Sequence, residues 1–340
     1  MNNDAVYESS PVTRRKVTDI FTREEIRQLT QRSDLMGFWA VSSTWAIIAA
    51  AFVVLAHLGG QPLWLALPLA VLSVAVIAGR QLALAIMMHD AAHGTLFKTR
   101  WLNDVLTDWV CARPIWNDLH KYRAHHFIHH TKTGTDDDSD ISLVAGFPAT
   151  RASLTRKFLR DISGLTGLKF FLGRLLQDAG YLKWTVANDV VVLPANGRKL
   201  HHYVFTALRN MVPMLIANGV LFALFALSGH PLLYGVWVLA YTTPFPLFVR
   251  IRSMAEHGCL ERTPDMFQNT RTTRAGWLAR SFVAPLRVHY HIEHHVMASV
   301  PYFRLQAMHR LLRERGAVSE PPGYVEVLRI ISSAGQAQEA

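Results

Sequence analysis

The sequence predicts an all-α integral membrane protein with four transmembrane helices in two hairpins, interfacial helices and a cytosolic histidine-rich cap. Composition is the first reason: 50% of the 340 residues are hydrophobic and only 18% are charged, against about 25% charged in an average soluble domain. The second is that the hydrophobic residues gather in long uncharged runs. The third is that histidines cluster just outside these runs. We expect a single membrane-embedded domain over residues 1–340.

Four uncharged runs are long enough to cross a bilayer, and they cover residues 37–58, 62–79, 211–228 and 232–249. A spanning helix needs roughly 20 apolar residues, with a range near 17–25. Short turns join the runs in pairs, which predicts a first hairpin over 37–88 and a second over 206–252. The first 35 residues are polar and lack the apolar core of a secretory signal.

The distribution of positive charge predicts the orientation. All 35 Lys and Arg residues lie outside the four runs and their two connecting turns. The positive-inside rule then places both turns outside and both termini in the cytosol, together with segments 1–35, 89–205 and 253–340. This predicts a bacterial inner membrane or an ER-type membrane. The net charge of +10 fits the same rule and contact with anionic lipid, and without a recognised motif it does not predict nucleic-acid binding.

Two segments are too polar to span but suit the membrane surface. Residues 101–116 carry three tryptophans, a residue type that favours the interface, and residues 155–184 mix apolar and basic side chains. Both predict interfacial helices. Cys111 and Cys259 lie in segments assigned to the cytosol and are expected to be reduced thiols.

Nine histidines predict a metal centre. They form three clusters and one single site: His89 and His93; His126, His129 and His130; His291, His294 and His295; and His257. Spacings of three and four residues put imidazoles on one helix face, and neutral imidazole is the commonest metal ligand. A single zinc takes about four ligands, so nine imidazoles predict two metals. Histidine-rich coordination without thiolate, with open positions, suits iron that activates oxygen.

Polar residues near the clusters are predicted to support them. Metal-bound histidines usually donate their second N–H to a carboxylate or carbonyl, and the candidates are Asp90, Asp140, Glu256, Glu293 and Asn269. Asp137 and Asp138 equally suit a solvated acidic loop. Trp116 and Arg123 are candidates for contact with a substrate or headgroup. Whether His289 is a ligand is left open. Six further histidines are expected not to be ligands: His57, His120, His125, His201, His202 and His230.

At these residues the chain resembles the integral-membrane fatty acid desaturase family. The resemblance rests on residues 89–94 (HDAAHG), 123–130 (RAHHFIHH) and 290–295 (YHIEHH), and on their order around the second hairpin and His257. It implies two non-haem iron ions, O2 as co-substrate and a tunnel for an acyl chain. It also implies two electrons from an external donor, a ferredoxin or b-type cytochrome with its reductase. The function predicted is O2-dependent desaturation of an acyl-lipid or acyl-thioester.

Two other functions stay open. A hydroxylase or a carotenoid ketolase would use the same centre and begin with the same C–H abstraction, and no residue separates them from a desaturase. A membrane metal-binding or transport protein is disfavoured, because it predicts ionisable residues inside the spans and the four runs hold no histidine or charged residue apart from His57 in the last turn of the first.

Overall fold

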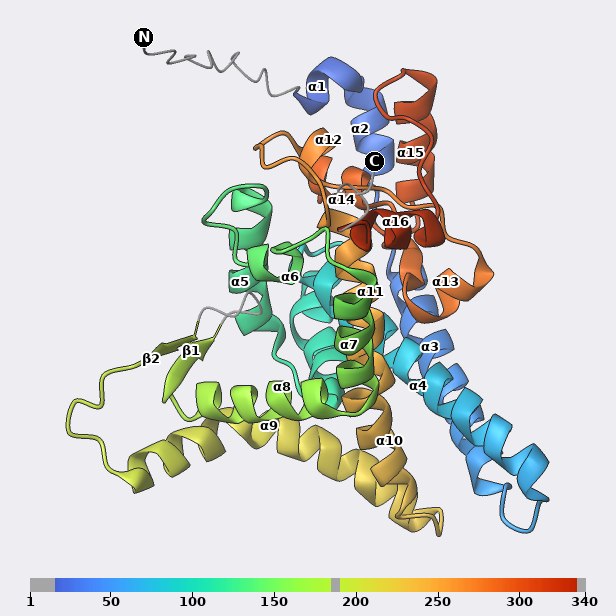
Figure 1. The fold of residues 1–340 in the computed structure, drawn as a ribbon, viewed down its shortest axis with the longest axis vertical. Coiled ribbons are helices and arrows are strands. Elements are labelled where there is room, and N and C mark those ends of the chain that lie inside the picture. Colours follow the sequence, from blue (N-terminus) through green and yellow to red (C-terminus); the bar gives the residue numbers. More distant parts are fainter. Residues whose placement is uncertain (1–15, 185–189, 335–340) are drawn as a thin grey trace.

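The computed structural model describes residues 16–184 and 190–334, and most of these residues are in helices (Figure 1). The strands in this part are β1 (Leu182–Trp184) and β2 (Val190–Val192), which pair antiparallel with Leu182 opposite Val192. The predicted all-α class is therefore confirmed. Three helical stretches are long and apolar enough to cross a membrane: Arg23–Ala56, Leu63–Ala92 and Leu200–Leu227.

The first predicted hairpin is formed by α3 (Asp34–Ala56) and α4 (Leu63–Ala92). Ser33 caps α3, its side chain accepting a hydrogen bond from the Met36 N–H at 3.3 Å. With 30 residues, α4 is about 45 Å long, which exceeds a bilayer core of roughly 30 Å. Its last turn therefore extends beyond the apolar run and carries His89, as the sequence predicted.

The second predicted hairpin is different. Its first helix is α9 (Leu200–Leu227), but the run 232–249 is divided between α10 (Leu233–Thr242) and α11 (Pro244–His257). The division falls at Thr243, because Pro244 and Pro246 lack the N–H groups that would continue the helix. At 10 residues, α10 is about 15 Å long and does not span a bilayer alone. Four continuous spanning helices are thus not observed.

The two segments expected at the interface are helical but interrupted. Residues 101–116 form two π-helical segments, η1 (Leu102–Leu106) and η2 (Asp108–Ala112), and the 3₁₀ turn η3 (Arg113–Ile115). Buried Arg113, in η3, forms ion pairs with Asp108 of η2 at 2.7 Å and with Asp118 just before α5 at 3.0 Å. Residues 155–184 divide into α7 (Arg151–Ile162), α8 (Leu165–Asp178) and β1, with Gly164 at a φ of +86° between the helices.

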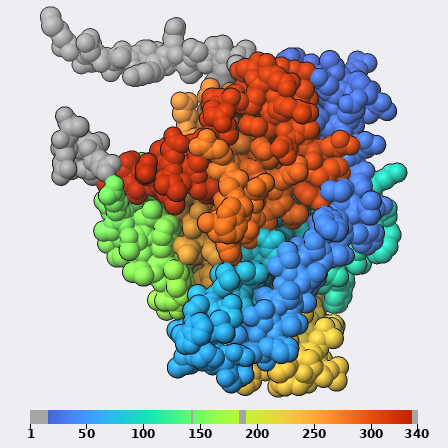
Figure 2. All heavy atoms as spheres, turned by 90° about the vertical axis from the view of Figure 1, so that its right-hand side faces the viewer, coloured from blue at the N-terminus to red at the C-terminus, as the bar shows by residue number. Residues whose placement is uncertain are grey.

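The remaining elements close the upper part of the molecule. In chain order they are α1 (Val17–Ile20), α2 (Arg23–Leu29), α5 (Leu119–Lys132), α6 (Ile141–Val144), α12 (Met266–Asn269), α13 (Trp277–Phe282), η4 (Pro285–Arg287), α14 (His291–Val296), α15 (Leu305–Glu314) and α16 (Tyr324–Ile331). Figure 2 shows the orange and red C-terminal part above the blue pair α3 and α4. Phe21 and Leu29 pack against Met308 and Leu312, which fixes the N-terminal helices to α15.

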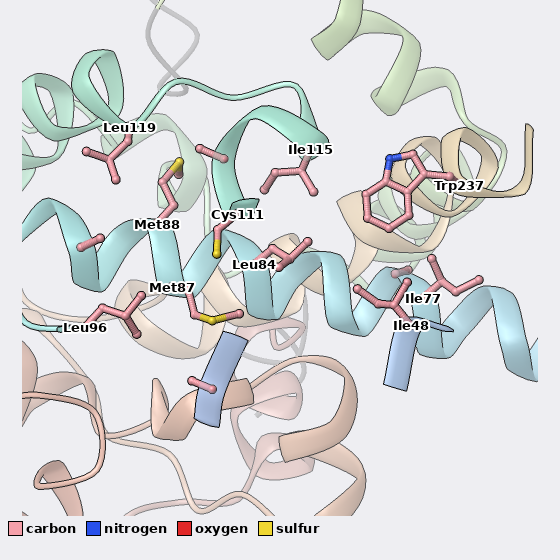
Figure 3. Packing of buried hydrophobic residues seen from close by; sticks show 14 of the residues in the cluster. Ile48, Ile77, Leu84, Met87, Met88, Leu96, Cys111, Ile115, Leu119 and Trp237 are labelled. Carbon is pink, nitrogen blue, oxygen red and sulfur yellow. The ribbon is translucent and has the colours of Figure 1, made fainter. Parts of the chain in front are cut away.

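The main core surrounds α4 (Figure 3). Leu84, Met87 and Met88 of this helix pack with Cys111 and Ile115, all at most 2% exposed. Burying a side chain of this size stabilises the fold by roughly 1.5–3 kcal/mol. Because α4 is held on several sides, the histidines at its end have fixed positions.

Candidate metal centre

Four helices bring the nine predicted histidines together in two groups. His89 and His93 come from α4, three histidines from α5, His257 from α11 and three from α14. The five-histidine group is His89, His93, His126, His130 and His294, and the four-histidine group is His129, His257, His291 and His295. Within each group the ligand nitrogens lie within 4.8 Å of one another, so each group could hold a metal ion.

In the five-histidine group the Nε2 atoms converge. His126 Nε2 lies 2.9 Å from His93 Nε2 and 3.0 Å from His130 Nε2, and His130 Nε2 lies 3.0 Å from His294 Nε2. The His89 ring centroid lies 4.4 Å from that of His294. Three segments of the chain, from α4, α5 and α14, therefore aim imidazole nitrogens at one point.

The imidazole rings of the four-histidine group converge in the same way. His257 Nε2 lies 2.8 Å from His291 Nε2, and the His257 ring centroid lies 4.9 Å from that of His129 and 5.1 Å from that of His295. The two groups are neighbours, because His130 of the first stacks on His295 of the second with centroids 4.2 Å apart.

Helix α5 serves both groups. His126 and His130 are four residues apart and join the five-histidine group, whereas His129 between them joins the other. The helical repeat explains this division. His126 and His130, four residues apart, lie one above the other, whereas His129 is rotated around the helix axis from both of them.

Two carboxylates hold histidine rings directly. Asp138 accepts from His129 Nδ1 at 2.8 Å, and Asp90 accepts from His89 Nδ1 at 2.9 Å. Asp138 is 8% exposed, whereas the side chain of its neighbour Asp137 is 75% exposed. Of the two residues that the sequence left undecided, Asp138 therefore belongs to the site and Asp137 is on the surface.

The other predicted supporting residues lie at the site with different partners. Asp140 accepts from His125 Nε2 at 2.8 Å and lies 3.9 Å from His129 Nδ1. Glu256 pairs with Arg252 at 2.6 Å and lies 3.6 Å from His291 Nδ1. Both of these carboxylates are thus one step further from the histidine groups than Asp90 and Asp138.

Asn269 and Glu293 complete the predicted supporting set. Asn269 acts through its backbone, because its carbonyl accepts from His257 Nδ1 at 3.2 Å. Glu293 is fully buried and accepts from Thr272 Oγ1 at 2.5 Å and His309 Nδ1 at 2.7 Å. His309, on α15, was not identified from the sequence, since a single histidine on a helix with 15% of its side chain exposed carries no pattern that distinguishes it.

Trp116 and Arg123, the two residues predicted to contact a substrate or headgroup, have different surroundings. Trp116 lines the cavity described below, with its backbone in the left-handed region at a φ of 57°. Arg123 does not line that cavity. It donates to the carbonyls of Ala91 at 3.1 Å and Ala92 at 2.9 Å, and pairs with Asp104 at 2.6 Å, so it braces the end of α4 against α5.

Burial keeps most of the cluster histidines neutral. Desolvation, with the positive charge of neighbours, lowers the pKa of His93 to about 4, of His257 to about 3 and of His130 to about 2. Neutral imidazole is the form that binds metal. His129 differs: burial opposes its protonation, but the hydrogen bond to Asp138 and nearby carboxylate charge raise its pKa above the usual value.

A cavity of about 290 Å³ opens beside the four-histidine group. His126, His129, His257 and His291 form part of its wall. Much of the remaining wall is apolar, and includes Leu82, Met88, Val144, Phe170, Tyr241 and Phe245. An apolar chain could therefore lie in this cavity with one of its carbons next to the histidines.

Comparisons with known proteins agree with this architecture. Residues 62–324 match the fatty acid desaturase family. The chain is 27% identical to the dihydrorhizobitoxine desaturase of Bradyrhizobium elkanii over 90% of this chain and 82% of that protein. It is 26% identical to the sn-1 oleoyl-lipid 12-desaturase of a Synechocystis strain, over 66% of this chain and 63% of that protein.

A third relative is more distant. The Delta(5) fatty acid desaturase of Caenorhabditis elegans is 24% identical over 71% of this chain and 56% of that protein. The chain thus spans less than two thirds of the Synechocystis and C. elegans relatives. The family match nevertheless covers most of the chain and both histidine groups, and the named relatives are all desaturases. The chain belongs to the fatty acid desaturase family and is an oxidoreductase.

Proposed function

We propose that this enzyme uses O2 to desaturate a fatty acyl chain at two non-haem iron ions held by the nine clustered histidines. His89, His93, His126, His130 and His294 would hold one ion, and His129, His257, His291 and His295 the other. The observation that carries the proposal is the convergence of imidazole nitrogens from four helices beside an apolar cavity.

The donor geometry suits metal ions. Four pairs of Nε2 atoms lie 2.8–3.0 Å apart, so one ion could bind several of these nitrogens at once. His89 Nε2 and both ring nitrogens of His295 are buried without hydrogen-bond partners in the described part of the chain. An unsatisfied buried polar group costs about 1–3 kcal/mol, a cost that metal binding would remove.

The surrounding residues would keep the rings in place. Asp90 and Asp138 accept from the Nδ1 atoms of His89 and His129, which leaves the Nε2 atom of each ring for a metal. The Asn269 carbonyl does the same for His257. Asp140, Glu256 and Glu293 support this arrangement through His125, Arg252 and His309.

When bound, the irons would supply the oxidising power that removes hydrogen from unactivated methylenes. Overall, two hydrogens leave adjacent carbons as a double bond forms, and O2 with two further electrons and two protons becomes two waters. The chain contributes positioning, because the cavity wall holds the acyl chain and excludes water. Burying each methylene contributes about 0.8 kcal/mol to binding.

The electrons would come from a separate donor, a ferredoxin or a b-type cytochrome with its reductase. We place both termini and the histidine groups on the cytosolic side, in a single domain over residues 1–340 of a bacterial inner membrane or ER-type membrane. The net charge of +10 supports docking of an acidic donor at that side. Trp116 would contact the substrate, while the contacts of Arg123 favour a structural role.

The test is product analysis by mass. The chain is expressed in a host membrane under air beside His294→Ala, and total lipids are profiled, with dihydrorhizobitoxine as an added substrate because a relative is named for it. A species lighter by two hydrogens, absent with His294→Ala, is expected among the fatty acids. A species heavier by one oxygen would replace the proposal with a hydroxylase, and a change confined to the added compound would replace the acyl substrate.

A further inference from the structure

Part of the cavity wall outside the two histidine groups is polar. Trp116 and Asn117, just before α5, line it together with Arg174 and Gln177 from the last turns of α8. Phe170 and Tyr241 line the same cavity. A charged side chain in such a wall requires an explanation, because burying a polar group is costly unless it is paired.

The Arg174 guanidinium contacts Asp178 and Asn117, and one of its nitrogens has no hydrogen-bond partner among the described residues. Its Nε donates to Asp178 Oδ2 at 2.7 Å, and its Nη1 lies 3.5 Å from Asn117 Oδ1. Its Nη2 is buried and has no partner among the described residues. Asp178 is 1% exposed and also pairs with Lys121 at 2.7 Å. One carboxylate therefore lies between two cations, and the cation that lines the cavity keeps a free N–H group.

The position of Asn117 relative to α5 gives the scale of the separation between Arg174 and the histidines of that helix. Asn117, beside Arg174, lies two residues before α5 begins at Leu119, and the helix rises about 10 Å from Leu119 to His126. Extended carbon chains advance about 1.25 Å per bond, given C–C bonds near 1.5 Å. About eight carbon–carbon bonds would cover that rise.

We propose that Arg174, with Asn117 beside it, binds the oxygen-bearing end of the substrate and thereby selects which carbon reaches the histidines. The ligand chemistry is an acyl oxygen, either the carboxylate of a free acid or the carbonyl of an ester. A hydrogen bond from a guanidinium to either oxygen is of the stronger, charge-assisted kind. This inference rests on the proposed function, since it names how that substrate is recognised.

Binding to metal-free protein tests the recognition separately from catalysis. Purified protein in detergent is loaded with fluorescent parinaric acid, which is then displaced by stearic acid, methyl stearate or octadecane. We expect the two oxygen-bearing competitors to bind about tenfold to a hundredfold more tightly than the alkane, the range that one hydrogen bond to a charged group gives. Equal displacement by acid and ester would identify the carbonyl as the ligand, and preference for the acid would identify the carboxylate.

Variants assign this preference to Arg174. Arg174→Met should abolish it, while Lys121→Met should keep it, because Lys121 also pairs with Asp178 but does not line the cavity. Arg174→Lys, which preserves a cation next to Asp178, should retain part of the preference and is decisive if Arg174→Met does not fold. An unchanged preference in Arg174→Met, or equal binding of octadecane by the wild type, would overturn the proposal.

The position of the double bond provides the second readout. In lipids made by active wild-type enzyme the bond should occupy one position, and Arg174→Lys should spread it over neighbouring carbons. If Arg174 had a purely structural role, Arg174→Lys would lower the yield of product without changing the position of the double bond. If the wild type forms no double bond, the proposed function fails, while the competition experiment still decides the binding role of Arg174.

Discussion

The adjacent residues Asp137 and Asp138 differ in one hydrogen bond, which joins Asp138 to a histidine of the candidate metal centre. Asp138 is buried against His129 Nδ1, whereas Asp137 is exposed and lies 3.4 Å from Lys132. The carboxylate of Asp138 fixes the ring orientation and increases the basicity of the nitrogen that would face a metal. The neighbouring aspartate offers a matched control for this effect.

Asp138→Asn should reduce iron affinity and desaturation by about 10–100-fold, the usual cost of losing such a partner. Asp137→Asn should leave both close to wild type. Iron per protein after dialysis against a chelator, and the rate of product formation, measure the two effects. Equal iron retention in the two variants would show that Asp138 does not support a ligand.

The depressed pKa values of the cluster histidines make the metal-free fold sensitive to acid. The pKa of His93, His130 and His257 in the folded state, about 4, 2 and 3, lies below the unfolded value near 6.5. The unfolded chain therefore binds more protons as the pH falls. The stability that these groups contribute is complete above about pH 6.5 and is lost progressively below it, by up to about 1.4 kcal/mol per pH unit for each group.

Thermal unfolding of metal-free protein in detergent should thus shift to lower temperature between pH 7 and pH 5. His130→Gln should reduce the size of this shift, and the exposed His202→Gln should not. The opposite result, a protein whose Tm is constant or rises as the pH falls to 5, would mean that these imidazoles are not buried as neutral groups.

A glycine allows α4 to pack closely against α13. Gly79 on α4 has no side chain at its contact with α13, and a Cβ there would lie 2.7 Å from the Ser281 carbonyl oxygen. Gly219 on α9 would place a Cβ in open space. The two positions share a residue type and a helical backbone, so they differ mainly in what a methyl group would meet.

Gly79→Ala should destabilise the protein by about 1–3 kcal/mol through overpacking. Gly219→Ala should be neutral or stabilising by up to about 1 kcal/mol, since alanine favours the helix. The Tm of the purified variants in one detergent measures both. A lower Tm for Gly219→Ala than for Gly79→Ala would contradict the close approach of α4 and α13.

The molecule is organised as apolar helices below and a histidine-rich part above. The histidines of both groups come from the C-terminal ends of α4 and α11 and from α5 and α14, and the C-terminal helices α14 and α15 lie in the upper part (Figure 1). The predicted connections at residues 59–61 and 229–231 lie at the opposite ends of α3, α4, α9 and α10. The positive-inside rule assigns these two ends to opposite sides of a membrane.

Labelling of single cysteines tests that orientation. Starting from a chain with Cys111 and Cys259 replaced by serine, exposed positions Gln61, His230 and Ser319 are changed to cysteine one at a time. We expect a membrane-impermeant thiol reagent to label positions 61 and 230 in intact cells, and position 319 only after permeabilisation. Labelling of position 319 in intact cells would reverse the proposed orientation.

The sequence by itself determined the helical membrane class, the family and the set of nine clustered histidines. These properties are local, because apolar runs and spacings of three or four residues depend only on neighbouring positions. The division of the fourth run at Thr243 also has a local cause in Pro244 and Pro246, although run length alone predicted a continuous helix. Hydropathy averages over such breaks, so run length alone could not show that the fourth run is divided between two helices.

Tertiary structure alone decided how the histidines divide into two groups and which polar residues serve them. His129 and His257 are neighbours across 128 residues of sequence, and the partner of Glu293 is a histidine on another helix. The burial of Asp138 and the free N–H of Arg174 likewise depend on which segments pack around them. The physical reason is that burial and hydrogen-bond partners are set by contacts between distant segments, which no local pattern contains.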